Sequence, residues 1–323
     1  MNLSVCSIYA LLTSVRDKSC QYGGVSGYWW QVTDLKPFPI PRLNQKMLSQ
    51  TQVLLIFNKF IMKIATWNVN SIRTREDHVK KWLVDQDIDI LCLQETKVVD
   101  QDFPRQSFID LGYHLYIYGQ KAYNGVAIFS KKPLDTINYG FGGILESDLV
   151  GNLDDQKRVI SGVINNVRIV NLYVPNGNSL GSEKYEYKLQ WLSLLQKYLA
   201  TINPTKNDVL VCGDFNIALE DKDIYKPEGR EKQVMATPTE RGALRKVLDL
   251  GLKDVFRRFH PEEGHFSWWD YRQGGFAKNR GWRIDHIYLS QSLLPRAVAC
   301  HIDVEPRKLI KPSDHAPVVV ELR

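Results

Sequence analysis

The sequence predicts an α/β protein in which two mixed β-sheets pack face to face and helices flank their outer faces. Strand-like segments greatly outnumber the helix-like segments between them, so a single parallel sheet wound with alternating helices fits badly. Several strands are almost continuously apolar, among them IDILCLQE at residues 88–95 and DVLVCGDFN at 208–216. Such runs are typical of strands covered on both faces.

The regular pattern begins at Met62 and continues to the end of the chain. Apolar residues at helical spacing predict helices over residues 75–86 and 184–202. Runs rich in Val, Ile, Leu and Tyr predict strands over residues 63–69, 88–95, 113–119, 125–131, 158–164, 167–177, 208–216, 282–290 and 316–322. No tandem repeat of 20 to 50 residues interrupts this order, which argues against a repeat protein.

Composition and charge restrict the class of protein without assigning a function. The 323 residues are 44% hydrophobic and 24% charged, as in an ordinary soluble globular protein, which excludes global disorder and a disulfide-rich scaffold. The net charge of +6 is concentrated in residues 1–61, which hold six Lys or Arg and two Asp. Residues 62–323 therefore hold 36 basic and 34 acidic side chains, so charge alone does not indicate a nucleic-acid partner.

Cysteine usage and hydropathy predict a cytoplasmic protein without a membrane anchor. The five cysteines form no CxxC pair, which argues against a disulfide framework and against a cysteine zinc site. Cys92 and Cys212 lie in apolar runs, where a reduced thiol packs as a small hydrophobe. No stretch of 18 uncharged apolar residues and no basic region before the apolar N-terminal patch are present, so neither a membrane span nor a secretory signal is expected.

Residues 1–61 differ in texture from the rest of the chain, with scattered Trp, Tyr, Pro and Gly and no sustained period. Two interpretations stay open at this point. Either the segment is a poorly ordered N-terminal extension, or Met62 is the true start of the protein. In both cases residues 62–323 are expected to form one catalytic domain.

Polar side chains follow the apolar strands at the points where the strands end. Any one of these is commonly a turn residue, but together they would gather at one rim of a sheet, where sites are often built. Carboxylate and amide oxygens suit a hard cation such as Mg²⁺, so the pattern predicts a metal-assisted phosphoryl-transfer site. The residues concerned are Asn68, Asn70, Glu95, Tyr173, Asn176, Asp214, Asn216, Asp285, Asp314 and His315.

Seven motifs in order carry a family resemblance: ATWNVNSIR, LQETK, YVPNG, GDFN, FSWWDYR, NRGWRID and SDHAPV. This set resembles the exonuclease III-type apurinic/apyrimidinic (AP) endonucleases of the endonuclease/exonuclease/phosphatase superfamily, over residues 62–323. The resemblance implies a four-layer αββα sandwich with the active site at one end of the two sheets.

The resemblance also implies a metal site. Glu95 corresponds to the main ligand, with Asn68 and Asp314 in the same sphere, and Asp214, Asn216 and His315 are also expected among the metal-binding residues. The expected cofactor is Mg²⁺, with Mn²⁺ as a substitute. Some family members have Asp where this chain has Asn70, and the loss of that charge predicts a lower metal affinity or a different metal number.

The implied catalytic roles follow the same motifs. Asp214 corresponds to the residue that activates water, and Asn216 to the amide that holds the phosphate. His315 corresponds to the imidazole that contacts the phosphate and is oriented by Asp285. Tyr173 corresponds to a phenol that contacts the phosphate or assists the leaving oxygen. A further phosphate contact is implied for one more side chain, Asn176.

The implied substrate is duplex DNA with abasic sites or 3′ ends, cleaved by a monomer. Hydrolysis would occur 5′ to the abasic nucleotide, and nucleotides would also be removed from 3′ ends. Trp268, Trp282 and Ile284 correspond to an apolar pocket for the flipped-out deoxyribose, which excludes a nucleotide that retains its base. Trp269 is expected in the core. Basic side chains near the pocket are expected to contact phosphates, namely Arg272, Lys278, Arg280 and Arg283.

Two alternatives remain at this point. A superfamily relative acting on lipid or soluble phosphates often places a second His where this chain has Tyr173, and it lacks the GWRID tryptophan. A non-catalytic nucleic-acid-binding relative would have lost Glu95, Asp214, Asp285 or His315, and all four are present. The other six histidines of the chain are expected to be surface or core residues.

Overall fold

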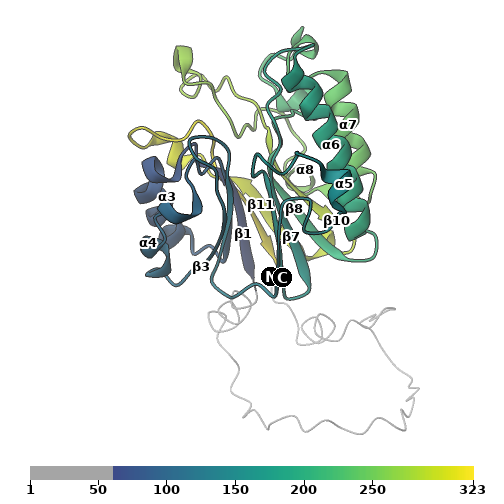
Figure 1. Ribbon diagram of the computed structural model, residues 1–323. Coiled ribbons are helices and arrows are strands. Elements are labelled where there is room, and N and C mark those ends of the chain that lie inside the picture. Colours follow the sequence, from purple (N-terminus) through teal and green to yellow (C-terminus); the bar gives the residue numbers. More distant parts are fainter. Residues whose placement is uncertain (1–60) are drawn as a thin grey trace, which may run out of the picture. The chain divides into compact units, whose positions relative to one another are not determined.

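The computed structural model of the protein describes residues 61–323, so the expectations for the N-terminal segment lie outside the described residues. In this part of the chain two six-stranded mixed sheets pack face to face, and helices lie on their outer faces (Figure 1). The predicted αββα sandwich is therefore confirmed. Each sheet has one parallel pair of strands near its centre and is otherwise antiparallel.

The first sheet has the strand order β11-β12-β1-β2-β4-β3. Its strands are β1 (Met62–Asn68), β2 (Ile90–Gln94), β3 (His114–Tyr118), β4 (Val126–Ser130), β11 (Ala297–Ile302) and β12 (Val318–Leu322). The second sheet has the order β5-β6-β7-β8-β10-β9. Its strands are β5 (Thr136–Tyr139), β6 (Val159–Ile164), β7 (Val167–Tyr173), β8 (Asp208–Asp214), β9 (Leu252–Asp254) and β10 (Asp285–Ser290).

Helices cover the outer face of each sheet. The α-helices are α3 (Ile72–Gln86), α4 (Gln106–Ile109), α5 (Ser147–Val150), α6 (Glu183–Ile202), α7 (Pro238–Leu248) and α8 (Val255–Phe259). In Figure 1, α3 and α4 flank the sheet that holds β1 and β3, whereas α5, α6 and α7 flank the sheet that holds β7 and β8. Short 3₁₀ turns occupy Asp100–Asp102, Asp221–Asp223, Arg230–Lys232, Arg272–Gly274, Leu294–Arg296 and Glu305–Lys308.

The continuous apolar strands are explained by burial on both faces. Ile90 and Cys92 of β2 point into the cluster between the two sheets, together with Cys212 of β8. Leu91 and Leu93 alternate with them and pack outward under α3. Because both faces are covered, neither face needs polar residues, and the two-residue alternation of a half-exposed strand is absent.

Several elements were not predicted from the sequence. The helix expected over residues 75–86 begins three residues earlier, and α4, β5, α5, α7, β9, α8 and β11 were missed. β11 has a register shift against β12 and only partial burial, so its hydrophobic pattern is weak. α7 does have a sequence signal, since Thr237 and Glu240 form a capping box with Pro238 at the first helical position.

The strand directions bring the polar residues to one end of the sandwich. Asn68 ends β1, and Glu95 directly follows the parallel strand β2. Tyr173 and Asp214 end the parallel strands β7 and β8 and are register partners. Asp285 opens the antiparallel strand β10 opposite Asp214. All of these strand ends therefore meet at the same rim.

Two further expectations are tested by the described residues. Within residues 61–323, every helix is too short or too polar to traverse a lipid bilayer. The three cysteines of this part of the chain, Cys92, Cys212 and Cys300, are free and buried. All three belong to the cluster between the sheets, and for Cys92 and Cys212 packing as small hydrophobes was predicted.

Candidate active site

Asn68 joins the two sheets at the centre of the site. Its side chain is completely buried, and its amide nitrogen donates to Glu95 Oε1 and to Asp214 Oδ2, both at 2.9 Å. Glu95 belongs to the first sheet and Asp214 to the second, so a single amide spans the gap between the carboxylates of both sheets. The structure therefore brings these three sequence-predicted residues together.

Glu95 is held as a carboxylate by three donors. Besides Asn68, the Tyr173 hydroxyl donates to Oε1 at 2.8 Å, and Lys97 Nζ lies 2.7 Å from Oε2. Burial alone would raise the pKa of Glu95, but the Lys97 charge and the hydrogen bonds from Asn68 and Lys97 outweigh it and lower the pKa. Glu95 therefore presents a full negative charge to the site.

A second chain of contacts connects Glu95 to Asp314. Lys97 Nζ also donates to Asn70 Oδ1 at 2.6 Å, and Asn70 Nδ2 donates to Asp314 Oδ1 at 2.9 Å. Trp268 Nε1 donates to the other Asp314 oxygen at 2.9 Å. An Asp at position 70 could not make the donation to Asp314, so the amide at this position has a structural reason of its own.

His315 lies between two carboxylates. Its Nδ1 is 2.9 Å from Asp285 Oδ2, and its Nε2 is 3.8 Å from Asp214 Oδ2. Burial would lower the pKa of His315, but the two carboxylates outweigh it and raise the pKa to about 10. The imidazole is therefore protonated at neutral pH, which favours contact with a phosphate oxygen over ligation of a metal.

For Asp214, in contrast to Glu95, burial outweighs the neighbouring positive charge in its effect on the pKa. Its side chain is almost completely buried, and this desolvation raises its pKa to about 7, although the nearby His315 charge acts to lower it. A carboxylate with a pKa close to neutral is suited to accept a proton from water. Asn216 Nδ2 donates to Asp214 Oδ2 at 3.2 Å, and Asn176 Nδ2 donates in turn to Asn216 Oδ1 at 3.0 Å, so Asn176 reaches this carboxylate only through Asn216.

Tyr173 is a neutral phenol backed by an arginine. Burial and the neighbouring Glu95 charge raise the pKa of its hydroxyl well above the usual value. The Arg158 guanidinium lies 4.5 Å from the centre of the Tyr173 ring and donates to the Tyr173 carbonyl at 3.1 Å. Arg158 therefore orients this side chain, a role that was not predicted from the sequence.

Other supporting residues were also missed. Ser267 Oγ donates to Asp285 Oδ2 at 2.6 Å, which fixes the carboxylate that orients His315. Ser313 Oγ donates to the Asn68 carbonyl at 2.7 Å. Both serines lie inside motifs that identify the family, so their positions were marked, but their roles depend on contacts distant in sequence.

The three residues predicted to form an apolar pocket lie together beside His315. Trp282 is paired with Trp268 in a short antiparallel bridge, and Trp268 is bridged in turn to His315. Trp282 and Ile284 are buried, whereas Trp268 is partly exposed. Trp282 and Ile284 pack with the cluster of Ala218, Ile224 and Ala236.

One expectation near this pocket is wrong. Arg283 is 1% exposed and is paired with Asp223 at 2.7 Å and Asp254 at 2.8 Å, so it cannot contact a phosphate. Its charge instead compensates two acids inside the protein. Trp269 is buried in the core, as predicted. The remaining basic side chains expected to contact phosphates are exposed on the preceding loop, namely Arg272, Lys278 and Arg280.

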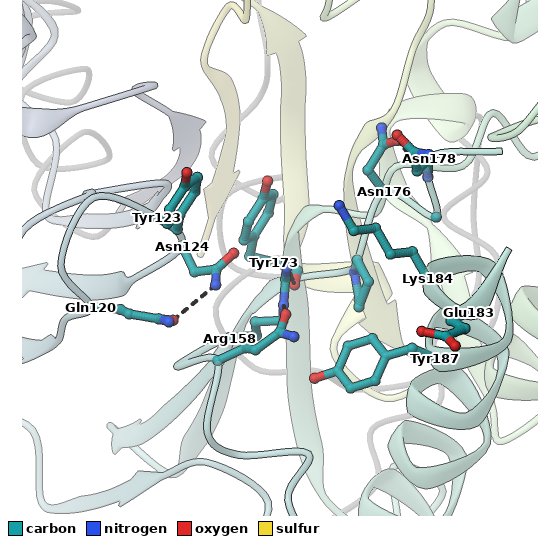
Figure 2. Close-up of a pocket in the computed structure, with 13 residues that line it drawn as sticks. Gln120, Tyr123, Asn124, Arg158, Tyr173, Asn176, Asn178, Glu183, Lys184 and Tyr187 are labelled. Atoms are coloured by element: carbon teal, nitrogen blue, oxygen red, sulfur yellow. Dashed lines mark hydrogen bonds between the residues drawn. The ribbon is translucent and has the colours of Figure 1, made fainter.

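A groove of about 650 Å³ borders the site at Tyr173 and lies between the β3–β4 loop and the start of α6. Figure 2 shows Tyr173 on its floor, with Tyr123 on one side and Asn176 and Lys184 on the other. Arg158 and Lys184 supply positive charge along it and Glu183 one negative charge, and most of its other lining side chains are polar. The groove therefore offers an extended polar path that leads to Glu95 through Tyr173.

The side chains present fit a hard divalent cation. Glu95 and Asp314 are both charged, since the charges and hydrogen bonds around them keep the pKa of each below its usual value despite burial. The Lys97 ammonium lies between Glu95 and Asn70, which marks a position that attracts positive charge. Asp214, Asp285 and His315 also bring their polar atoms within 4.8 Å of one another, but there the His315 imidazolium already supplies the positive charge. Oxygen donors predominate, as magnesium requires.

Comparison with known proteins gives consistent matches. Residues 65–315 match the model of the endonuclease/exonuclease/phosphatase family. Exodeoxyribonuclease III of Haemophilus influenzae is 36% identical over 274 residues, which cover 81% of this chain and 100% of that protein. An AP endonuclease from Archaeoglobus fulgidus superposes with a TM-score of 0.76 at 41% identity, covering 80% of this chain and 98% of that one. The 3′ phosphatase NExo from Neisseria, solved with a product DNA hairpin, has a TM-score of 0.76 at 38% identity and covers 81% and 99%.

Proposed function

The chain belongs to the endonuclease/exonuclease/phosphatase family and, within it, to the exonuclease III-type nucleases; from this premise we propose that it is a DNA repair enzyme acting on abasic sites and 3′ ends. It hydrolyses phosphodiesters on the 5′ side of abasic nucleotides in duplex DNA and removes nucleotides from 3′ ends. The activity resides in residues 62–323. The single observation that carries the proposal is the junction at Asn68, whose amide contacts the carboxylates of Glu95 and Asp214 together.

Asp214 accepts the proton of the attacking water. Its raised pKa, about 7, means that the carboxylate is available near neutral pH and still basic enough to take a proton. The His315 imidazolium and the Asn216 amide both lie next to Asp214 Oδ2 and donate to the phosphate oxygens as charge develops there. Asp285 and Ser267 hold the imidazole in its orientation.

Glu95, Asp314 and Asn68 hold a divalent cation, for which we propose Mg²⁺ with Mn²⁺ as a substitute. When bound, this cation neutralises negative charge on the scissile phosphate. The Lys97 ammonium contacts Glu95 Oε2 and Asn70 Oδ1, so it compensates the same carboxylate before a cation enters. Tyr173 and Asn176 contact the phosphate from the side of the groove.

Trp268, Trp282 and Ile284 select the base-free sugar. Their apolar surface borders the segment that carries His315, so a sugar placed against it presents its phosphate to the imidazolium. A deoxyribose without a base is small enough to enter and costs little to unstack. This pocket favours DNA over the lipid or soluble phosphates used by other members of the superfamily.

The DNA backbone crosses the site along the groove. Arg158 and Lys184 line one part of it, and the exposed side chains of Arg272, Lys278 and Arg280 lie on the loop that precedes the pocket. Contacts of this kind position a duplex without reading its sequence and weaken with salt. We further propose that the enzyme acts as a monomer in the cytoplasm, which agrees with its free, buried cysteines.

The test uses the full chain and a labelled duplex that contains one abasic analogue. With Mg²⁺, the expected product is a nick on the 5′ side of the analogue with a 3′-hydroxyl, and EDTA abolishes it. A duplex of the same sequence without the analogue is the control, on which slow removal of 3′ nucleotides is expected. Two results would overturn the proposal: cleavage that persists in EDTA, or equal internal nicking of the abasic duplex and the control duplex.

A further inference from the structure

Three potential metal ligands come together away from the active site, on the loop after α8. His265 Nε2 lies 2.7 Å from Glu262 Oε1, and His260 Nδ1 lies 3.4 Å from the same oxygen. All three ligand atoms lie within 4.8 Å of one another. The three side chains are partly exposed, so an ion from solution can reach them.

The hydrogen bonding of His260 leaves one ring nitrogen free to bind a cation. Its Nε2 lies 2.9 Å from the backbone carbonyl of Cys300. A carbonyl oxygen can only accept, so Nε2 carries the hydrogen and Nδ1 of the neutral ring is left with a lone pair. In that tautomer the lone pair faces Glu262 Oε1 at 3.4 Å, and two acceptors at this separation are bridged by either a proton or a metal cation. A metal-bound histidine commonly has its second nitrogen fixed in this way.

The loop is held in shape before any ion binds. The Arg257 guanidinium donates to the backbone carbonyls of both His260 and Glu262, and it is anchored by a hydrogen bond to the completely buried Asp223. The Phe256 ring stacks on the His260 ring with centroids 4.7 Å apart and meets the His265 ring edge-on at 5.6 Å. Backbone and rings are therefore ordered by the fold, which reduces the entropy lost on binding an ion.

We propose that His260 Nδ1, Glu262 and His265 Nε2 bind a transition-metal ion of the zinc class. Two imidazoles and one carboxylate suit zinc, with a water as the fourth ligand on the exposed side. Ligand atoms about 2.1 Å from a tetrahedral zinc ion lie about 3.4 Å from one another, which the His260–Glu262 separation already matches. The His265–Glu262 contact would lengthen slightly as the ion replaces the shared proton.

The ion would stabilise the segment that carries Trp268, one of the residues proposed to contact the sugar. His265 is followed directly by Phe266, Ser267 and Trp268, and Ser267 contacts Asp285 while Trp268 contacts Asp314. On the other side, His260 connects the ion to β11 through the Cys300 carbonyl. The site is therefore structural: it touches no substrate and stabilises the loop from outside the active site.

The experiment measures zinc binding to the full chain by calorimetry, after EDTA treatment and dialysis, in an excess of Mg²⁺. Four proteins are compared: the wild type, Glu262→Gln, His265→Asn and the control Glu263→Gln, which changes a carboxylate one residue away. We expect the wild type and Glu263→Gln to bind one zinc equivalent more than the other two variants. Any zinc bound at the active site is common to all four proteins and cancels.

Thermal unfolding provides the second measurement. Zinc should raise the Tm of the wild type and of Glu263→Gln by more than that of Glu262→Gln and His265→Asn. Because Glu262 and His265 are partly exposed, their substitution leaves the fold intact, which circular dichroism without zinc verifies. Equal zinc stoichiometry in all four proteins, or an equal rise in Tm, would overturn the proposal and identify the cluster as an ordinary His–Glu ion pair.

Discussion

Lys188 and Glu240, neither of which is exposed to solvent, form an ion pair beneath the active site with Lys188 Nζ 2.5 Å from Glu240 Oε1. The same ammonium donates to the backbone carbonyls of Asn176 at 3.1 Å and Asn216 at 2.8 Å. Glu240 also closes the capping box at the start of α7 with Thr237. One buried charge therefore connects α6 and α7 to both loops that carry the site asparagines.

Lys188→Met is expected to lower the free energy of unfolding by about 3–5 kcal/mol, because Glu240 is left buried without its partner. Nuclease activity should fall as well, since the loops at Asn176 and Asn216 lose their common anchor. Urea denaturation measures the first effect. Lys197→Met, an exposed position on the same helix, should change stability by less than about 0.5 kcal/mol. A Lys188→Met/Glu240→Gln double variant should recover part of the loss, and no recovery would contradict the ion-pair explanation.

Asp214→Asn is expected to reduce nicking of an abasic duplex by about a hundredfold or more, because the amide cannot accept the proton of water. Duplex binding should stay within about tenfold, since Asn keeps the shape of the side chain and removes no phosphate donor. Gel-based cleavage and fluorescence anisotropy measure the two quantities. Asp208→Asn, at the other end of β8, is the control. Persistent nicking by Asp214→Asn would refute the water-activation role.

Asn70→Asp is expected to make stability depend on the divalent cation. The new carboxylate cannot donate to Asp314 and adds a like charge, so without metal the free energy of unfolding should fall by about 1–3 kcal/mol. The added charge should strengthen cation binding, so saturating Mg²⁺ should close the gap to the wild type. Unfolding curves with EDTA and with Mg²⁺ give both values. A deficit of the same size under both conditions would contradict this interpretation.

The Asp223→Asn variant tests the buried ion pair with Arg283 through the pH dependence of the free energy of unfolding. Burial acts to raise the pKa of Asp223, but Arg283 and Arg257 outweigh it and hold the pKa far below the usual 3.8. A depressed folded-state pKa contributes stability above the unfolded-state pKa, and this contribution is lost as pH falls. The stability difference between wild type and variant should therefore be constant from pH 7 to about 5 and shrink below about pH 4. Urea unfolding across this range measures it, with Asp221→Asn as the exposed control.

Trp282→Ala is expected to impair cleavage at abasic sites more than removal of nucleotides from a plain blunt end. The substitution removes most of the apolar surface beside Ile284 that would receive a base-free sugar. A buried Trp→Ala change also costs about 3–5 kcal/mol, so Trp269→Ala, which removes a core tryptophan outside the pocket, serves as the control. The measurement is the ratio of the two activities. Equal losses on both substrates would show that the pocket does not confer selectivity.

Most strands of the sandwich could be predicted from the local pattern of apolar residues. The apolar runs that contain Cys92 and Cys212 predicted strands buried on both faces, and the structure places both residues between the sheets. Motif order was enough to select Asn68, Glu95 and Asp214, because the chemistry of the reaction restricts which residue types can occupy those positions. β11 was missed because a bulged, half-buried strand has no clear period.

Only the tertiary structure shows which charged side chains face the site and which form ion pairs in the protein interior. Arg283 lies in the same motif as Trp282, yet it is buried against Asp223 and Asp254. In the sequence Lys188 is one of several polar residues on an amphipathic helix. In the structure its ammonium contacts the carbonyls of Asn176 and Asn216 and the carboxylate of Glu240. Periodicity is a local property of the chain, whereas the partner of a buried charge is chosen by segments that meet only after folding. The sequence by itself therefore determined the fold class and the reactive groups, and the packing of distant segments determined how those groups are supported.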